Sequence, residues 1–286
     1  MKLTNWHNLC PQSIKMKNIF ILLLVFCSCS SPKQVIAPRG SLSGDNALNP
    51  TILTYGKLFT ALFQQRAAEY RALCFQAYNI ARLRLEQALP NTEKLPPAII
   101  TDIDETILDN SPYAVHQALL GRDYDQLEWY NWSKLADADT LPGAPSFFKY
   151  AASRGVQIFY ISNRSESEKM NTLLNLKKYN FPDADTIHLL FRQSTSSKES
   201  RRRQVMEHYK VLLLLGDNLG DFSDMFDKKT EDERTKNTNL NSMEFGDRFI
   251  VLPNPGYGDW ESSFFNYNHF SGAQKDSIIR KTLKNF

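Results

Sequence analysis

AIITDIDETILDNSPY, residues 98–113, is the stretch of sequence that decides the fold. It opens with a short unbroken apolar run that ends at Thr101, as is typical of a strand buried on both faces of a parallel sheet. Two carboxylates, Asp102 and Asp104, follow at once with a single isoleucine between them. Carboxylates beside a buried strand are costly unless a cation or a phosphoryl group neutralises them. The segment therefore predicts a strand that ends in a functional site.

Further apolar runs follow this one along the chain, separated by helical stretches. They span residues 156–161, 186–190, 211–215 and 249–252. Continuous apolar strands that alternate with helices predict an α/β protein whose central parallel sheet is covered on both faces. Ligands of such sheets bind beyond the carboxyl ends of the strands, so the residues after each run are the candidates for chemistry.

Polar residues follow several of these runs in an order that suits phosphoryl transfer. Ser162 ends the second run, Asp217 and Asp221 follow the fourth, and Lys198 begins a helical stretch before it. Carboxylates hold Mg²⁺, a hydroxyl and an ammonium group bind phosphate oxygens, and an aspartate can be a nucleophile. Each feature alone is commonplace, since a lone Asp-x-Asp is usually a loop or a helix cap. Their placement behind successive strands favours the functional interpretation.

These residues resemble the four motifs of the haloacid dehalogenase (HAD) superfamily of phosphohydrolases. Longer strings are similar to class C acid phosphatases, the lipoprotein 5′-nucleotidase family: DIDETILDNSPY at 102–113, YISNR at 160–164, GDNLGDF at 216–222 and VLPNPGYGDWE at 251–261. The resemblance covers about residue 45 to the end. It implies a HAD-like three-layer sandwich with a central parallel sheet over residues 46–286. A smaller α-helical subdomain is expected from residues 46–95 and 113–141.

The resemblance also implies a role for each motif residue. Asp102 would attack phosphorus and form an aspartyl-phosphate, and Asp104 would protonate the leaving alcohol and then activate water. Mg²⁺ would be held by the Asp102 carboxylate, the Asp104 backbone carbonyl and Asp217, with Asp221 in support. The phosphate-binding residues would be Thr106, Ser162, Asn163 and Lys198. The alternative for Asp221 is an ordinary carboxylate in the first turn of a helix.

One residue departs from the family pattern. Gly220 stands where many members are expected to have aspartate. Because the spacing from Asp217 to Asp221 is intact, we expect an altered helix start and not a loss of metal binding.

Aromatic residues gather between the first two motifs and after the last apolar run. From the resemblance, Tyr124 and Tyr257 are predicted to clamp a nucleobase by stacking, which contributes about 1–3 kcal/mol per base in nucleic-acid binders. The alternative is that these rings only pack in the core or at an interface.

The N-terminus has the order of a secretory signal: Lys17, an apolar run over 19–26, and then Cys27-Ser28-Cys29. This arrangement resembles a bacterial lipoprotein signal. Cys29 is the predicted lipidation site because small Ser28 precedes it, whereas bulky Phe26 precedes Cys27. We expect residues 1–28 to be the signal peptide, with Met16 as an alternative start, and residues 29–45 to be a tether. The alternative is a secretory signal without lipid.

The charge distribution separates this leader from the rest of the chain. The formal net charge is +3, and residues 1–28 contribute Lys2, Lys15 and Lys17 with no acidic residue. The remainder balances at 31 basic and 31 acidic residues. The body of the protein therefore gives no electrostatic reason to expect nucleic-acid binding.

Together these features predict an exported, lipid-anchored, Mg²⁺-dependent acid phosphatase, placed in the cell envelope as an outer-membrane lipoprotein. Its expected partners are a small phosphomonoester, with 5′-nucleotides favoured, the membrane through its lipid, and a second copy in a homodimer. One alternative is a broad-specificity or sugar-phosphate phosphatase. The others are a non-catalytic surface-binding lipoprotein and a phosphotransferase.

Overall fold

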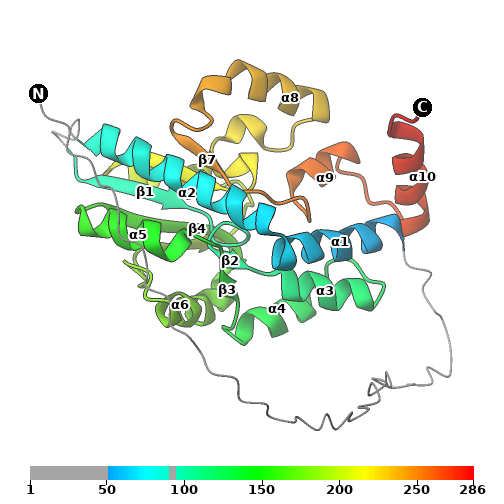
Figure 1. Cartoon of the computed structure of the whole chain (residues 1–286), viewed down its shortest axis with the longest axis horizontal. Coiled ribbons are helices and arrows are strands. Elements are labelled where there is room, and N and C mark those ends of the chain that lie inside the picture. The colour runs from blue at the N-terminus through cyan, green and yellow to red at the C-terminus, as the bar shows by residue number, and fades with distance from the viewer. Residues whose placement is uncertain (1–50, 90–94) are drawn as a thin grey trace, which may run out of the picture. The chain divides into compact units, whose positions relative to one another are not determined.

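The computed structural model describes residues 51–89 and 95–286, and its centre is a five-stranded sheet of order β5-β4-β1-β6-β7 (Figure 1). The strands are β1 (Pro97–Thr101), β4 (Gln157–Ser165), β5 (Leu189–Arg192), β6 (Lys210–Gly216) and β7 (Phe249–Val251). Every neighbouring pair in this sheet is parallel. The α/β class and the central parallel sheet are therefore confirmed.

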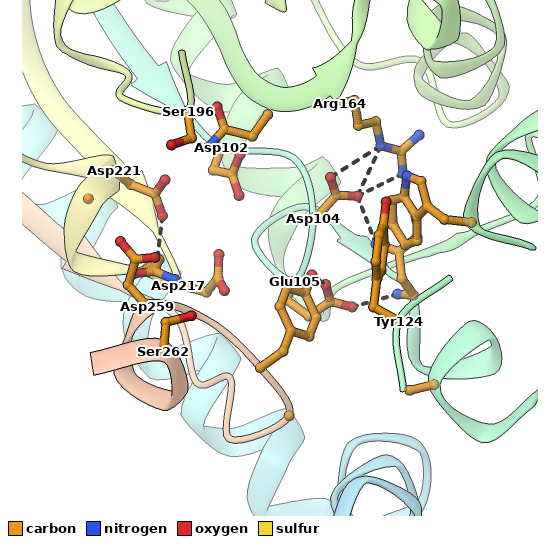
Figure 2. Close-up of a pocket in the computed structure, with 18 of the residues that line it drawn as sticks. Asp102, Asp104, Glu105, Tyr124, Arg164, Ser196, Asp217, Asp221, Asp259 and Ser262 are labelled. Carbon is orange, nitrogen blue, oxygen red and sulfur yellow. Dashed lines mark hydrogen bonds and ion pairs between the residues drawn. The ribbon is translucent and has the colours of Figure 1, made fainter. Parts of the chain in front are cut away.

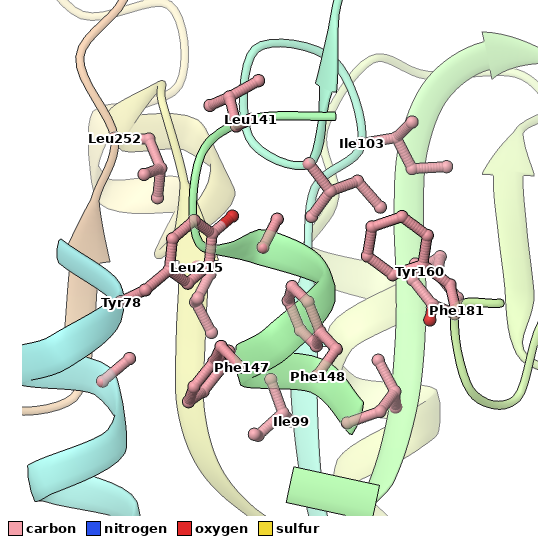
Figure 3. Packing of buried hydrophobic residues seen from close by; sticks show 14 of the residues in the cluster. Tyr78, Ile99, Ile103, Leu141, Phe147, Phe148, Tyr160, Phe181, Leu215 and Leu252 are labelled. Atoms are coloured by element: carbon pink, nitrogen blue, oxygen red, sulfur yellow. The ribbon is translucent and has the colours of Figure 1, made fainter. Parts of the chain in front are cut away.

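Helices cover both faces of the sheet, because alternate strand residues point to opposite sides. Ile99 and Ile158 belong to one buried cluster, together with residues from α2 (Ala68–Ala88), α5 (Ala144–Ser153) and α6 (Lys169–Lys178), part of which Figure 3 shows. Ile100 and Phe159 belong to the cluster on the other face, with Val205 of α7 (Glu199–Met206). Burying each such side chain contributes about 1.5–3 kcal/mol, so the two clusters fix the strand ends that carry the site.

The N-terminal part of the described chain consists of two helices. α1 (Ile52–Arg66) and α2 are separated by Ala67, whose backbone is extended at φ −81° and ψ 130°. α2 lies against the sheet, whereas α1 packs against α3 (Ser111–Leu119), where Gln65 donates to Ser111 at 3.0 Å. The helical subdomain of 46–95 and 113–141 stays a prediction.

The third apolar run begins its strand later than predicted. Residues 186–188 precede β5, because the Asp185 carboxylate accepts hydrogen bonds from the backbone N–H groups of Ile187 (2.8 Å) and His188 (2.9 Å). This Asx-type turn satisfies locally the donors that a strand would use. The strand then starts at Leu189.

A small antiparallel pair forms the base of the insertion after the first motif. β2 (Leu108–Asp109) pairs with β3 (Asp139–Thr140), and between them lie α3 and α4 (Gln126–Lys134). The remaining helices are α8 (Glu231–Leu240), α9 (Asp259–Phe264) and α10 (Gly272–Thr282). The 3₁₀ turns named among the described residues are η2 (Glu166–Glu168), η3 (Leu219–Asp221), η4 (Asp224–Phe226) and η5 (Ser242–Glu244).

Several predictions concern the N-terminal leader. The signal peptide 1–28, the tether 29–45 and Cys29 lie outside the described residues. Within 51–89 and 95–286, no helix has the length and apolar character needed to cross a bilayer.

Candidate active site

The carboxyl ends of β1 and β6 bring three predicted metal ligands together. Asp102 follows β1 and is fixed by its backbone N–H, which donates to Leu215 O of β6 at 2.9 Å. Asp217 follows β6, and Asp221 lies one turn later. Carboxylate oxygens of these three aspartates lie within 4.8 Å of one another (Figure 2). Asp102 and Asp221 are 119 positions apart in the sequence, but adjacent parallel strands place the three aspartates at one edge of the sheet.

The loop after β6 places Asp221 by a very close approach. A Cβ at Gly216 would lie 2.3 Å from the Asp221 Cβ, so only glycine leaves room for the turn. The turn is closed by the Asn218 backbone N–H, which donates to Asp221 Oδ2 at 2.9 Å. Asp221 therefore accepts a hydrogen bond in the first turn of η3, as the alternative interpretation expected. It also belongs to the aspartate cluster, as the metal-site interpretation expected.

Glycine at position 220 has a physical reason in this loop. A Cβ there would lie 3.0 Å from Asp227 Oδ1 and 3.8 Å from Asp259 Oδ2. A carboxylate in this place would add a third negative charge to a crowded patch. Although Gly220 replaces the aspartate expected from the family pattern, Asp221 still lies beside Asp102 and Asp217.

Lys198 lies among the carboxylates at the start of α7. Its Nζ forms ion pairs with Asp102 and with Asp221, the latter at 2.7 Å. Burial alone would lower the pKa of Lys198, but Asp102 and Asp221 reverse this and raise it. The ammonium group is thus held in its charged form, as an oxyanion ligand requires.

The aspartates carry more negative charge than Lys198 can offset. Burial raises the pKa of Asp102 to about 7, with Asp221 and Asp104 adding to the rise and Lys198 opposing it. Burial, followed by the charges of Asp221 and Asp102, raises the pKa of Asp217 well above its usual range. Three carboxylates in this arrangement are a donor set suited to a hard divalent cation.

Asp217 has supporting hydrogen bonds on both oxygens. Thr106 Oγ1 donates to Oδ1 at 3.2 Å, and Asn254 Nδ2 donates to Oδ2 at 2.7 Å. Thr106 was predicted as a phosphate-binding residue, and the structure places its fully buried hydroxyl on this carboxylate.

Ser162 and Asn163 follow the core of β4 and differ in exposure. Ser162 is fully buried, accepts from the Arg164 backbone N–H at 3.1 Å and lies 3.5 Å from Asp104 Oδ2. Asn163 is exposed, and its side-chain oxygen accepts from Arg201 at 2.7 Å. Both therefore lie at the edge that carries the carboxylates.

Asp104 is paired with an arginine that the sequence prediction did not assign to the site. Arg164 NH2 lies 2.7 Å from Asp104 Oδ1, and Asn110 Nδ2 donates to the same oxygen at 2.8 Å. Arg164 stands within the YISNR string, so its signal in the sequence was a charged residue close behind an apolar run. Only the fold shows which carboxylate it meets.

The two predicted clamp tyrosines line one cavity of about 790 Å³ with Asp102 and Asp104. Tyr124 is 58% exposed and Tyr257 is 39% exposed, so both rings offer surface to a ligand. The Tyr257 hydroxyl donates to Glu105, a carboxyl that sequence reasoning also missed. Burial, with a contribution from Asp104, raises the pKa of Glu105 to about 8.

Residues 53–260 match the model of a family described as HAD superfamily, subfamily IIIB (Acid phosphatase). The chain belongs to this family. It is also similar to the structure of the class C acid phosphatase from Bacillus anthracis, with 40% identity, a TM-score of 0.79, and coverage of 82% of this chain and 99% of that one. The structure of that enzyme with tungstate bound matches equally well. The HAD-like sandwich and the class C resemblance are thereby confirmed.

Two curated plant proteins share part of this similarity. Acid phosphatase 1 of Solanum lycopersicum is 25% identical over 163 residues, which cover 55% of this chain and 57% of the relative. The stem 31 kDa glycoprotein of Glycine max is 25% identical over 164 residues, covering 55% and 58%. The chain thus spans less than three-fifths of the length of these relatives. HAD phosphatases generally use a divalent metal, and the Asp102–Asp217–Asp221 cluster fits one.

Proposed function

We propose that this protein is an acid phosphatase that uses Mg²⁺ and hydrolyses phosphomonoesters, with 5′-nucleotides as preferred substrates. The observation that carries the proposal is the meeting of Asp102, Lys198 and the Asp217–Asp221 pair beside Asp104 in one cavity. This set contains a nucleophile, a cation for phosphate oxygens, metal ligands and a second carboxyl for proton transfer.

The chemistry follows from these positions. An Asp102 oxygen forms a bond to phosphorus while the bond from phosphorus to the leaving oxygen breaks, and the Asp104 carboxylic acid gives its proton to that oxygen. Water then attacks the phosphorus of the aspartyl-phosphate, and the Asp104 carboxylate takes up a proton from that water. Inorganic phosphate leaves, and Asp102 is free again. A bound divalent cation would offset the negative charge of the phosphoryl group.

Lys198 and Ser162 are proposed to bind the phosphoryl oxygens, with Thr106 and Asn163 as helpers. Lys198 already faces Asp102, so a phosphoryl group that reaches Asp102 comes within range of a full positive charge. Tungstate, which the Bacillus anthracis enzyme is described as binding, is a tetrahedral oxyanion like phosphate. We infer that this chain binds an oxyanion of the same shape, with Lys198 and Ser162 as its ligands.

Phosphate release from a panel of substrates tests the proposal. AMP, glucose 6-phosphate and p-nitrophenyl phosphate would each be measured with Mg²⁺ and with a chelator, between pH 5 and 8. We expect chelator-sensitive release that favours AMP. Equal release from all three would support the broad-specificity alternative. No release from any would leave the non-catalytic alternative, and phosphate transfer to added glycerol would reveal a phosphotransferase.

Alanine in place of Tyr257 is expected to raise KM for AMP about 10-fold and to change KM for p-nitrophenyl phosphate far less. The reason is the loss of one stacking face, which contributes about 1–3 kcal/mol. Tyr257→Phe is the matched control, because it keeps the ring and removes only the hydroxyl that donates to Glu105. If alanine raised both KM values equally, the ring would have no part in base recognition.

The location of the protein is a separate proposal. The predicted signal and Cys29 support an outer-membrane lipoprotein, with the described domain held by residues 29–45. Mass spectrometry of the N-terminal peptide from membrane fractions should find a lipidated Cys29. A homodimer stays a prediction, for which exposed Tyr55 and Phe59 on α1 offer apolar surface. Sedimentation analysis of the purified protein would decide it.

A further inference from the structure

We propose that Arg164 is a positioning residue that aims the carboxyl group of Asp104 at the leaving oxygen. The inference rests on the proposed function, in which Asp104 is the general acid. It assigns a role to a buried arginine whose side chain pairs with Asp104 and Thr172, and which forms no ion pair with the three-aspartate cluster within the described residues.

The contacts of Asp104 are uneven between its two oxygens. Oδ1 accepts from Arg164 NH2 at 2.7 Å, from Arg164 Nε at 3.0 Å and from Asn110 Nδ2 at 2.8 Å. Oδ2 has only longer contacts, with Arg164 Nε at 3.2 Å and Ser162 Oγ at 3.5 Å. Three strong donors on Oδ1 leave Oδ2 as the oxygen that is free to carry a proton. The planar fork of Arg164 therefore fixes both the rotation of the carboxyl group and the choice of oxygen.

Arg164 is itself held rigidly from its other sides. It is 3% exposed, and its NH1 donates to Thr172 Oγ1 of α6 at 3.0 Å. Its guanidinium lies 5.4 Å from the ring centroid of Trp129, whose indole N–H donates to the buried Glu168 at 2.9 Å (Figure 2 shows Arg164 beside Asp104). The geometry at Asp104 is thus supported by a second layer of contacts, as a precise proton-transfer site requires.

Stability alone is a weak reason for such a pair. A buried ion pair can often be replaced by apolar side chains of similar volume with no loss of stability, because desolvation of the two charges offsets their attraction. Asp104 also lines the cavity, where water could solvate its carboxylate if Arg164 were absent. The pair is better explained by the orientation that it gives to Asp104.

The support of Arg164 reaches the predicted recognition surface. The ring centroid of Trp129 lies 5.1 Å from that of Tyr113 and 6.3 Å from that of Tyr124, and all three residues line the cavity. A leaving group that stacks on this aromatic cluster contacts the same indole that packs on Arg164. Trp129→Phe should therefore affect the same step as a change at Arg164, to a smaller extent.

Leaving-group dependence is the readout that separates positioning from a structural role. A nitrophenolate leaves readily without a proton, whereas an alkoxide does not, so loss of acid catalysis affects alkyl phosphates most. We expect Arg164→Lys and Arg164→Gln to lower kcat/KM for glycerol 3-phosphate about 100-fold. For p-nitrophenyl phosphate we expect a fall of less than about 5-fold. Added guanidinium ion should partly restore alkyl phosphate turnover in Arg164→Gln.

Matched variants keep the outcomes distinct. Arg234→Ala removes another buried arginine, which donates to Phe226 O, and should lower activity toward both substrates alike. Asp104→Asn is the reference for loss of the acid. If it does not separate the two substrates, the acid assignment in the proposed function fails. If it does, but the Arg164 variants lower both substrates equally, the positioning role is overturned. Should Arg164→Gln fail to fold, Arg164→Lys and Trp129→Phe test the proposal through the same comparison, which is the loss of kcat/KM with glycerol 3-phosphate against the loss with p-nitrophenyl phosphate.

Discussion

Asparagine in place of Asp102 is expected to lower kcat/KM by at least about 10⁴-fold with every phosphomonoester. The amide has nearly the shape of the carboxylate but cannot attack phosphorus. The remaining groups stay in place, because Lys198 keeps its ion pair with Asp221 at 2.7 Å. Phosphate release and single-turnover trapping of a phosphorylated protein would both be measured. The wild type should give an acid-stable label on Asp102, and the variant should give none.

Asp259→Asn is the matched control for this experiment. Asp259 lines the same cavity, and burial raises its pKa despite the opposing charge of Arg234, but it lies outside the three-aspartate cluster. Its loss should change kcat/KM by less than about 10-fold, since it makes no bond to the reacting atoms. Thermal melting would show that both variants fold. Activity of Asp102→Asn within 100-fold of wild type would mean that another group is the nucleophile.

The part of the site that lies directly behind strands could be predicted from sequence. Asp102 and Asp217 are far apart in the chain, yet each follows an apolar run, and β1 and β6 are neighbours in the sheet. A parallel sheet places such residues at one edge whatever the loops do. Lys198 was found for a similar reason, because it begins the helix that leads into β6.

The residues that the sequence analysis missed depend on contacts between segments far apart in the chain. Arg164, near the end of β4, meets Asp104 across 60 positions, and the sequence around it does not show which carboxylate it pairs with. Glu105 has a left-handed backbone with φ 54°, which aims its carboxyl group at the Asn110 backbone N–H and the Tyr257 hydroxyl. The DIDETILDNSPY string contains Glu105, but its sequence does not predict this backbone conformation.

Removing the divalent cation is expected to abolish activity, by at least about 10³-fold, and to make the folded protein less stable as the pH rises. The pKa of Asp102 is about 7 in the folded metal-free protein, because burial opposes its ionisation, against an ordinary value of 3.8. The pKa of Asp217 is raised in the same direction. The folded state therefore binds more protons than the unfolded state between about pH 4 and pH 7. Raising the pH through that window favours unfolding.

Thermal melts with a chelator and with Mg²⁺, at pH 5.0, 6.0 and 7.5, test this directly. With the chelator, Tm should fall by about 5 °C across the range. With Mg²⁺ it should fall less, because the cation binds the ionised carboxylates and favours their charged form. Carboxyls with lowered pKa values, such as Asp123 at about 2, titrate below this window and do not contribute.

Asp102→Asn separates the effect of the three-aspartate cluster from that of Glu105, another buried carboxyl. Ionisation of Glu105, whose pKa is about 8, should also destabilise the folded state as the pH rises. Glu105 lies outside the three-aspartate cluster. The variant should therefore flatten the pH dependence of Tm in the chelator without removing it, and should weaken the effect of Mg²⁺. If the Tm of the wild-type protein in the chelator rose between pH 5.0 and 7.5, the raised pKa values of Asp102 and Asp217 would be contradicted. A variant that Mg²⁺ stabilised as much as wild type would place the cation elsewhere.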